Sequence, residues 1–582
     1  MLNLEKALNE KFPDLSQKLG GKWLIKFIKT LTHETEINDF IQTHQHLRGF
    51  AFLDHVLNHF NFGYRVSARS LNRIPAEGRV ILVANHPIGS LDGLALLKMV
   101  RSVRPDVRIV ASDLLNHIDP LQSLFLGVDN LSGKPSHKTQ FKAILAALEH
   151  DEAVIIFPAG EVSRIRPNGV RDGKWKAGFL KLAQKAQAPI VPILVDARNS
   201  ALFYGLSALY KPLGTLMLVQ EMFNKEYQEI EFHIGRAIPW KNVAKLELPA
   251  KTLAHRFRKH LYTLDKAGKP GKSFKPNDLF ETVETIAHPV DRKALKKALK
   301  TAQLLGKTQD GKIIYLYDFV ADSPVMHEIG RLRELTFRTV EEGTGHAIDL
   351  DVYDSRYRHL VLWDEEDLEI VGAYRIGECQ AIVDAHGVAG LYTSTLFELQ
   401  PELIQKLPHA IELGRSFVQP RYWGMRSLDY LWYGIGAYVR QHPHIAYLFG
   451  PVSLSNAYPA NAKQLIMAFY HQQFGPSQPY ALAKRPVTVS PENQTVAHTL
   501  FNDDYATSYK KLNALLELEG VKVPTLFKQY AELCDDRGCE FIDFSVDPQF
   551  GDCIDSLIWV ELAKIKPKKK QRYLTPLEES GK

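Results

Sequence analysis

Short apolar runs alternate with amphipathic segments through the first half of the chain. Each run is rich in Val and Ile and is bounded by turn-forming residues, which is typical of strands buried on both faces of a sheet. Strands are predicted at Val80–Ala84, Arg108–Ala111, Ala153–Phe157 and Ile190–Val195, with helices between them at Leu94–Val100, Thr139–Leu148 and Ala177–Gln187. This alternation of strands and helices indicates a mostly parallel α/β sheet.

The second half has a different pattern, in which strands follow one another and one long helix lies between the last two. Strands are predicted at Leu360–Leu362, Glu369–Arg375, Ala410–Val418 and Ala446–Pro451, and the helix at Leu428–His442. Residues 264–278 separate the halves and are rich in Gly, Pro and Lys, which is typical of a linker. A chain of 582 residues is too long for one ordinary domain. We therefore predict two α/β domains, at residues 1–263 and 279–582.

Composition narrows the classes of function. Hydrophobic residues make up 45% of the chain and charged residues 24%, a globular composition with enough apolar material for buried cores. The formal net charge of +6 is modest for this length, and no zinc finger or long basic stripe is present, so no nucleic-acid partner is expected. Cys534, Cys539 and Cys553 are clustered, but no fourth ligand completes a zinc set. We expect reduced thiols and no metal site.

Any membrane contact is predicted to be peripheral. No run of about 18 uncharged apolar residues is present, so no transmembrane helix is expected, and the charged N-terminus lacks the apolar region of a secretory signal. In the segment 20–33, Lys22, Lys26 and Lys29 fall on one helical face opposite a row of apolar residues. Such a helix lies at a headgroup boundary or packs on its own domain. The basic tail 566–572 attracts anionic lipid or an acidic partner, or it is disordered.

The stretch 83–93 places a histidine at the end of one predicted element and an aspartate at the start of the next. His86 follows the strand Val80–Ala84, and Asp92 opens a helical run after a short loop. A histidine removes a proton from an alcohol when a carboxylate fixes its tautomer, so Asp92 would hold one ring nitrogen and leave the other free. The alternative is structural, because Asp92 is also a good helix N-cap and His86 could bond the loop backbone.

A second loop strengthens the chemical interpretation. After the strand Ala153–Phe157 the chain continues Pro-Ala-Gly-Glu-Val-Ser-Arg, which puts Gly160, Glu161, Ser163 and Arg164 at the strand end. Both loops would lie at carboxyl ends of strands, where open α/β sheets bind ligands. Together with an apolar, proline-containing strand near residue 190, they resemble the blocks of the glycerophosphate/lysophosphatidate acyltransferase superfamily over residues 60–240.

That resemblance implies an O-acyltransferase. His86 would deprotonate an acceptor hydroxyl, which attacks an acyl thioester on acyl carrier protein or coenzyme A, and Asp92 would orient His86 and stabilise the imidazolium. The loop residues Gly160, Glu161, Ser163 and Arg164 would bind substrate, with Arg164 contacting a carboxylate and Gly160 allowing close backbone approach.

The sequence departs from the family pattern in two places. Five residues separate His86 from Asp92, where the family has four, and Ala159, Glu161 and Val162 replace the Glu, Thr and Arg of the family's third block. In the family those third-block positions help to hold a phosphorylated acceptor. Their replacement favours an alcohol without a phosphate.

The second half carries a strand–loop–helix arrangement at residues 411–439. Arg421 and Gly424 lie in the loop, and Arg426 lies at the start of the helix, where exposed amides bind phosphate oxygens. The spacing resembles the pyrophosphate loop of the GNAT fold, although Arg426 occupies a position that is small in that family. An arginine there suits a phosphopantetheine arm or an acidic carrier protein at least as well as free coenzyme A.

The surrounding residues 310–565 resemble the ornithine N-acyltransferases, which are GNAT-like enzymes related to acyl-homoserine-lactone synthases. In such enzymes a base deprotonates the amine, which attacks a 3-hydroxyacyl thioester. Glu412, in the stretch Glu-Leu-Gly-Arg-Ser, is the candidate base. Arg415 is a candidate for binding the substrate carboxylate or for holding Glu412. The alternative for Glu412 and Arg415 is an inward salt bridge that stabilises the strand.

The two-domain arrangement resembles the bifunctional ornithine lipid synthases of bacteria. It implies that the C-terminal domain makes an amide from ornithine and a 3-hydroxyacyl-carrier protein, and that the N-terminal domain then esterifies the 3-hydroxyl. The acyl thioester is a cosubstrate, no metal or redox cofactor is required, and the protein would lie peripherally on the cytoplasmic face of the inner membrane. Three alternatives stay open: a glycerolipid O-acyltransferase with a GNAT-like domain acting on another amine such as glycine, a non-catalytic docking module, and a thioester hydrolase.

Overall fold

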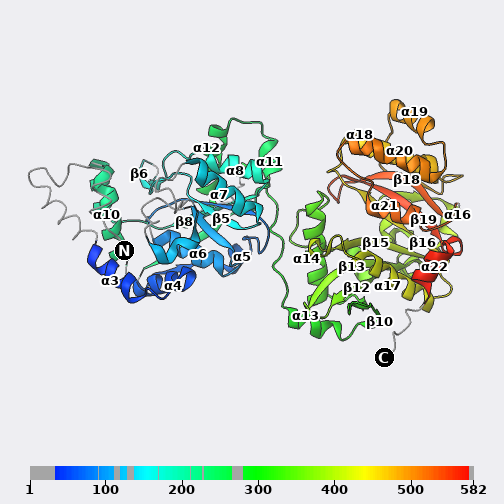
Figure 1. The fold of residues 1–582 in the computed structure, drawn as a ribbon, viewed down its shortest axis with the longest axis horizontal. Coiled ribbons are helices and arrows are strands. Elements are labelled where there is room, and N and C mark those ends of the chain that lie inside the picture. The colour runs from blue at the N-terminus through cyan, green and yellow to red at the C-terminus, as the bar shows by residue number, and fades with distance from the viewer. Residues whose placement is uncertain are drawn as a thin grey trace, which may run out of the picture. The chain divides into compact units, whose positions relative to one another are not determined.

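The computed structural model describes residues 33–89, 91–110, 118–126, 137–167, 169–209, 211–225, 228–264, 279–535 and 537–575. The chain divides into two compact units, Met1–His288 and Pro289–Lys582 (Figure 1). The predicted linker, apart from residue 264, and the basic amphipathic segment 20–33, apart from residue 33, lie outside the described residues.

Residues 279–288 pack with the first unit, although the sequence placed them at the start of the second domain. Val283 forms a bridge with Ala237, and the Thr285 hydroxyl donates to the carbonyl of Arg73. The division of the chain therefore falls between residues 288 and 289.

The first unit is built on a seven-stranded sheet in the order β1-β9-β8-β2-β5-β3-β4. All neighbouring strands run parallel except β8 and β9. The strands are β1 (Gly63–Arg65), β2 (Val80–Ala84), β3 (Val107–Val110), β4 (Phe125–Leu126), β5 (Ala153–Ile156), β8 (Ile190–Asp196) and β9 (Glu229–Ile234), with a separate hairpin of β6 (Arg164–Arg166) and β7 (Gly169–Arg171). The helices are α3 (Glu34–Thr43), α4 (Gly49–His59), α5 (Ala68–Leu71), α6 (Leu91–Arg101), α7 (His137–Glu149), α8 (Gly178–Ala186), α9 (Ala201–Leu209), α10 (Lys211–Phe223), α11 (Trp240–Ala244) and α12 (Ala250–Leu261).

Strand β2 shows why the apolar runs are continuous. Its residues Val80, Leu82 and Ala84 join one apolar core, while Ile81 and Val83 join another on the opposite face of the sheet. Helices α4 and α6 supply the first core, and α7, α8 and α12 supply the second (Figure 1). Because both faces are covered, neither can be polar, and the expected α/β class is confirmed.

The second unit holds an eight-stranded sheet in the order β10-β11-β12-β13-β15-β16-β19-β18. Its strands are β10 (Gln303–Lys307), β11 (Ile313–Asp318), β12 (Arg358–Asp364), β13 (Glu369–Glu378), β15 (Ala410–Val418), β16 (Tyr447–Leu454), β18 (Cys539–Asp547) and β19 (Cys553–Glu561), with β14 (Phe397–Leu399) and β17 (Ala481–Ala483) paired separately. Its helices are α13 (Arg292–Leu299), α14 (Pro324–Thr339), α15 (Cys379–His386), α16 (Pro401–Ile404), α17 (Ser427–Gln441), α18 (Ala460–Phe474), α19 (Pro491–Leu500), α20 (Tyr505–Leu518), α21 (Thr525–Ala531) and α22 (Pro567–Leu574).

Strands β15 and β16 are the parallel neighbours in this otherwise antiparallel sheet, and they pair over only three residues. Pairing ends at Glu412 opposite Phe449, although both strands continue beyond that point. Close approach at this junction requires glycine, because a β-carbon on Gly450 would lie 2.0 Å from the Leu413 carbonyl oxygen. The parallel pairing therefore ends at Glu412, and this end of the ladder positions the second candidate site.

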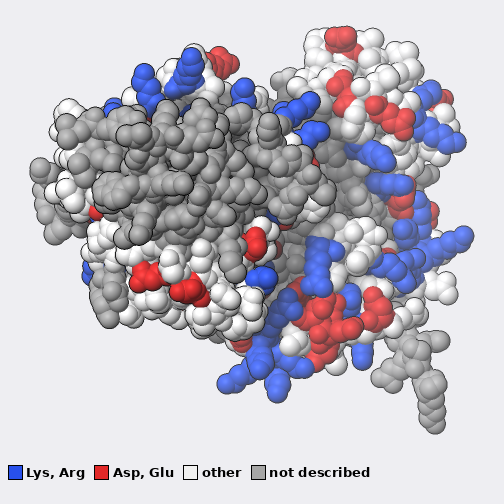
Figure 2. Space-filling model, turned by 60° about the vertical axis from the view of Figure 1, so that its left-hand side comes forward, with Lys and Arg blue, Asp and Glu red and all other residues white. Residues whose placement is uncertain are grey.

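Charges of both signs lie on the one face of the molecule that Figure 2 draws. On the face drawn in Figure 2, Lys and Arg side chains are interspersed with Asp and Glu. Among the described residues, no helix is long and apolar enough to cross a membrane, and the four cysteines are buried without disulfides.

Candidate functional site

The first candidate site begins at the carboxyl end of β2. The Asn85 side chain fixes this end, since its amide donates to the Val195 carbonyl at 2.9 Å and accepts from the Val195 N–H at 2.8 Å. The His86 ring stacks on Phe157, which follows β5, with centroids 4.1 Å apart. Adjacent parallel strands thus bring the two predicted loops together at one sheet edge.

His86 and Asp92 meet as the sequence predicts. His86 Nδ1 lies 3.2 Å from the Asp92 carboxylate, which is fully buried in the first turn of α6. The backbone N–H groups of Ile88 and Gly89 also donate to Asp92, at 3.0 and 3.3 Å. Asp92 therefore organises the loop and the ring at once. In the described part of the chain no hydrogen bond engages His86 Nε2, which leaves that nitrogen for a substrate.

The charges around His86 and Asp92 stabilise the ionised form of each side chain. Burial alone would lower the pKa of His86, but the carboxylate of Asp92, and further that of Asp172, outweighs burial and raises it. Burial alone would raise the pKa of Asp92, but His86 and the loop amides outweigh burial and lower it. An imidazolium formed by proton transfer is thus stabilised in place, as acyl transfer to a hydroxyl requires.

The four predicted loop residues fall into two groups. Ser163 faces the His86 loop, because its N–H donates to the His86 carbonyl at 2.8 Å, and Gly160 turns the chain with φ of 66°. Arg164 instead lies against α9, where it bonds the Ser207 hydroxyl and covers the Phe203 ring at 5.0 Å. Glu161 is partly exposed and lies beside Gly173.

Asp172 is a residue that the sequence analysis missed. It is fully buried and accepts from the Ser163 hydroxyl at 2.5 Å, from the Trp175 indole at 2.8 Å and from the His86 N–H at 3.4 Å. Burial raises the pKa of Asp172, against the lowering effect of these bonds. An acid three residues before a tryptophan was the available signal, but nothing in the spacing indicates contact with His86.

The second candidate site surrounds Glu412 on β15. The Glu412 side chain is 1% exposed and accepts three hydrogen bonds, from the Tyr357 hydroxyl, the Thr393 N–H at 2.7 Å and the Thr393 hydroxyl at 2.6 Å. Burial raises the pKa of Glu412, while the bonds from Thr393 and Tyr357 hold it down in part. The geometry gives a fixed carboxylate of increased proton affinity.

Arg415 lies on the same strand but does not bond Glu412. It sits at a β-bulge with φ of 48°, and its guanidinium reaches the Tyr392 hydroxyl at 3.1 Å, Asp349 at 3.4 Å and Asp351 at 3.5 Å. The inward salt bridge between Glu412 and Arg415 that was the alternative prediction is therefore absent among the described contacts.

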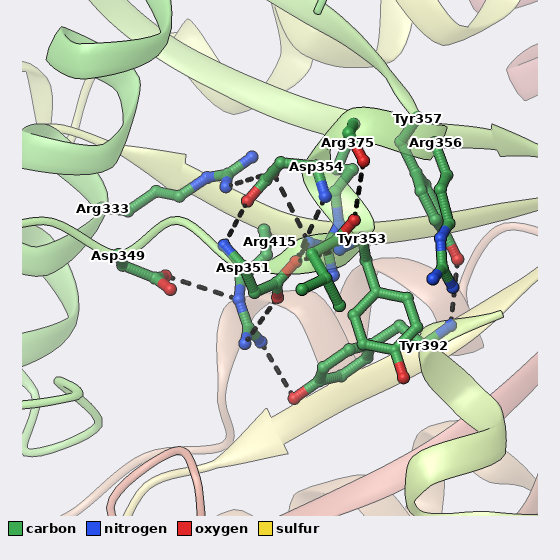
Figure 3. A network of polar contacts seen from close by, with 12 residues as sticks. Arg333, Asp349, Asp351, Tyr353, Asp354, Arg356, Tyr357, Arg375, Tyr392 and Arg415 are labelled. Carbon is green, nitrogen blue, oxygen red and sulfur yellow. Dashed lines mark hydrogen bonds and ion pairs between the residues drawn. The ribbon is translucent and has the colours of Figure 1, made fainter. Parts of the chain in front are cut away.

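Arg415 belongs to a buried network that no local motif predicts (Figure 3). Arg333 from α14 pairs with Asp354 at 2.7 Å, and Arg375 from β13 pairs with Asp351 at 2.7 Å. Asp351 and Asp354 also cap each other's backbone in a short 3₁₀ helix. The signal available in the sequence was a set of three acids within six residues, Asp349, Asp351 and Asp354.

Further buried acids lie near Arg415, and Tyr392 contacts both Arg415 and one of these acids. The Tyr392 hydroxyl donates to Asp547 at 2.5 Å, and Asp555 is 4% exposed beside Asp547. Burial raises the pKa of Glu342 to about 7, and burial together with Asp547 raises the pKa of Asp555 well above its usual range. Buried carboxylates thus outnumber the guanidinium groups around them.

The predicted phosphate loop lies at the start of α17. Arg421 is held by two carboxylates, Asp367 at 2.5 Å and Glu369 at 2.9 Å. Gly424 has φ of 77°, and Arg426 is the exposed residue directly before the helix. The Ser427 hydroxyl is buried with no hydrogen-bond partner in the described structure. The structure thus brings Gly424 and Arg426 to the helix start, with Arg421 beside them in an ion-pair cluster.

Both halves match known protein families. Residues 6–254 match the family described as acyltransferase, and residues 332–433 match the acetyltransferase (GNAT) domain family. The order of the two domains along the chain is the one that the sequence motifs predict.

Individual relatives carry related names. The chain is 30% identical over 306 residues to the glycine N(alpha)-acyltransferase of Phocaeicola vulgatus, covering 50% of this chain and 93% of that protein. It is 32% identical over 259 residues to the lyso-glycine lipid O-acyltransferase of Bacteroides thetaiotaomicron, covering 43% of this chain and 93% of that protein. It is also 33% identical over 150 residues to the L-ornithine N(alpha)-acyltransferase of Brucella abortus, covering 25% of this chain and 50% of that protein.

Proposed function

This chain belongs to the acyltransferases, with an acyltransferase domain in its first half and a GNAT domain in its second, and we propose that it adds two acyl chains in succession to one amino acid. One relative is named an N-acyltransferase and another a lyso-lipid O-acyltransferase, and this chain covers 93% of each. One chain therefore matches nearly the full length of both relatives. This observation carries the proposal, because it supports two reactions that share an intermediate.

The first reaction makes an amide in the second unit. The α-amine of the acceptor attacks the carbonyl carbon of a 3-hydroxyacyl thioester, the C–N bond forms, the C–S bond breaks, and the thiol leaves on its carrier. Glu412 takes the proton lost by the amine and returns it to the departing thiolate, since its raised pKa makes it a better base than an exposed carboxylate. Arg415 binds the acceptor's carboxylate at the edge of the buried network.

The second reaction makes an ester in the first unit. His86 Nε2 takes the proton of the 3-hydroxyl as its oxygen attacks a second acyl thioester, and the imidazolium then protonates the departing thiolate. Asp92 stays hydrogen-bonded to Nδ1 in both steps. The attacking oxygen belongs to the substrate, so no protein nucleophile is needed. The acceptor is a lyso-lipid with a hydroxyl and a carboxylate but no phosphate, which agrees with the replaced third block.

The surroundings of Arg415 favour a cationic amino acid. Asp349 and Asp351 pair with Arg415, and Glu342, Asp547 and Asp555 add further buried carboxyl groups nearby. A second ammonium group in the acceptor would pair with these carboxyl groups and favour their ionised form, because a buried carboxylate is costly without a partner. We therefore propose ornithine as the acceptor.

Glycine is the second candidate acceptor. Two relatives that this chain covers over 93% of their length carry glycine in their names. Glycine has no second ammonium, so its use would leave the acid excess without a role in substrate binding.

The proposed donor is an acyl carrier protein in both reactions, with acyl-coenzyme A as the alternative. The thioester is consumed as a cosubstrate, so the proposed chemistry involves no metal or redox group. Because the mono-acylated intermediate and the final product are lipids, we place the reactions at the cytoplasmic face of the bacterial inner membrane, with the protein bound peripherally.

The test is expression of the full chain in bacteria that lack amino-acid lipids, followed by mass spectrometry of total lipids. The parent chain is expected to produce a doubly acylated ornithine lipid. The variant His86→Ala should accumulate the mono-acylated amide, and Glu412→Ala should produce neither. The exposed residues His255 and Glu402 provide matched controls, since His255→Ala and Glu402→Ala should leave both products unchanged.

Three other outcomes would change the proposal. A glycine lipid in place of an ornithine lipid would assign the second candidate acceptor. Increased acylation of phospholipids without any amino-acid lipid would favour a glycerolipid acyltransferase. Unchanged lipids with free fatty acid released from thioesters would favour hydrolysis.

A further inference from the structure

The basic end of the chain forms an ordered helix. From the sequence, residues 566–572 were expected either to be disordered or to attract anionic lipid or an acidic partner. The structure describes residues 567–572 within α22, which spans Pro567–Leu574. Its Tyr573 side chain is buried and its lysines lie outward. The cations are therefore held at fixed positions rather than spread over a disordered segment.

Helix α22 packs against α17 through specific hydrogen bonds and an ion pair. Arg572 forms a two-pronged ion pair with Asp429 in the first turn of α17, and the Tyr573 hydroxyl donates to the same carboxylate at 2.9 Å. Arg440 near the other end of α17 donates to the Tyr573 carbonyl at 3.2 Å. A β-carbon on Gly436 would lie 1.8 Å from that carbonyl oxygen, so α17 has no side chain where α22 crosses it.

The resulting surface has a large excess of positive charge. We define the α22 surface as Arg426, Lys568, Lys569, Lys570 and Arg572. Asp429 is the one described carboxylate that forms ion pairs with these residues, and it is shared by Arg426 and Arg572. Within the described residues the three lysines form no ion pair. Four of the five residues are exposed, and Lys569 is partly exposed over the Tyr573 ring.

This surface borders the start of α17. Arg426 directly precedes the helix, whose start has no side-chain cap among the described residues, and N–H groups of a first turn bind oxygens of a phosphate. The Ser427 hydroxyl, which has no hydrogen-bond partner among the described residues, is buried at the same point. Trp423 and Met425 are large apolar residues that stay 46% and 64% exposed on the loop just before it. A phosphorylated arm entering here would have the basic surface beside its point of attachment.

We propose that the α22 surface docks the acidic body of a carrier protein whose phosphopantetheine arm delivers the acyl thioester to the second unit. The inference rests on the proposed N-acyltransferase function and adds to it the site of recognition. A carrier protein fits better than a membrane because the outward residues of α22 are cationic and polar, while its apolar residues face α17. Complementary charge would speed encounter and fix the orientation of the carrier.

The test measures binding of an acyl-carrier protein to the full chain by fluorescence anisotropy, and amide formation from two donors. In the variant Lys568→Glu/Lys570→Glu we expect about tenfold weaker carrier binding at low salt, with the difference shrinking as salt screens the charges. Amide formation from the acyl-carrier protein should fall, whereas formation from the same acyl group on free pantetheine should stay unchanged. The control Lys510→Glu/Lys522→Glu reverses two exposed lysines elsewhere in the same unit and should behave as the parent.

Unchanged carrier binding in the variant would overturn the proposal. So would equal losses with both donors, which would indicate a structural role, and so would weakened binding to vesicles of anionic phospholipid with normal carrier binding, which would make α22 a membrane surface. Failure of the proposed function is recognised separately, because the parent chain would then form no amide from either donor.

Discussion

The two candidate bases lie in opposite surroundings. His86 stands at the end of a strand with its side chain 18% exposed and one acid on Nδ1, and its Nε2 has no partner among the described residues. Glu412 lies in the middle of a strand, 1% exposed, with three hydrogen-bond donors on its two oxygens. The first base depends on a neighbouring charge and the second on exclusion of water.

This contrast has a physical consequence. The pKa of both groups is raised, but burial opposes the shift at His86 and causes it at Glu412. Removing the neighbour of His86 should therefore weaken the base, whereas removing a donor from Glu412 should raise its pKa further. Because both reactions occur in one chain, each activity is an internal control for the other.

The largest effect is expected for Asp92→Asn. The amide keeps the size of the side chain but not the charge that fixes the His86 tautomer, so O-acylation should fall about 10³-fold. Amide formation should not change, and neither activity should change in Asp151→Asn, which alters an exposed surface acid. Rates of both steps with purified protein and acyl-carrier protein give the measurement. O-acylation within threefold of the parent would show that Asp92 only stabilises the backbone of the loop.

A smaller effect is expected in the second unit for Tyr357→Phe. The variant removes one donor to the Glu412 carboxylate, and a hydrogen bond to a charged group contributes about 1.5–3 kcal/mol. Amide formation should fall about 30-fold, and its acid limb should move to higher pH because the pKa of Glu412 rises. Tyr480→Phe is the matched control, since the Tyr480 hydroxyl forms no hydrogen bond to Glu412 among the described contacts. A lower rate with an unmoved pH profile would contradict the assignment of Glu412 as the titrating base.

Local patterns predicted the elements that carry both bases. The strands at Val80–Ala84 and Ala410–Val418 have the predicted bounds, because continuous burial leaves a strong apolar signal. Helix α6 begins at Leu91 rather than Leu94, which places Asp92 inside the first turn. The meeting of His86 with Asp92 was predictable because only a short loop joins them.

Long-range partners were not predictable. Asp172 follows His86 by 86 residues. It lies in the connection from β5 to β8, and β2 lies between these two strands in the sheet. The network around Arg415 depends on the register of β13 and β15 and on a bulge between them, which no single segment encodes. The disorder considered for the tail was wrong for the same reason, since α22 owes its order to Asp429 and Gly436 on another helix.

The variant Asp172→Asn tests the first site more finely. Asp172 contributes to the raised pKa of His86, so the acid limb of the O-acylation profile should move to lower pH. The rate on the plateau should fall about tenfold because the link from Ser163 to the His86 loop is weakened. Rate against pH gives both quantities. A loss of thermal stability with no movement of the pH profile would reduce Asp172 to a structural role.

The smallest effect concerns the choice of amine. Asp555 lies among the buried acids near Arg415. Asp555→Asn should lower the preference in kcat/KM for ornithine over glycine about fivefold, because it removes a carboxyl group that a second ammonium would ionise and pair with. Asp552→Asn changes an exposed neighbour on the same hairpin and should leave the preference unchanged.

The pH dependence of this preference separates charge from shape. The pKa of Glu342 is raised by burial to about 7, so Glu342 is neutral below that value and ionised above it. Preference for ornithine should therefore increase as the pH rises through 7, and Glu342→Gln should abolish that increase while glycine acylation follows the titration of Glu412 alone. Competition between the two amino acids across this range gives the ratio directly. A ratio that stays flat in the parent chain would show that the acid cluster serves the fold rather than the substrate.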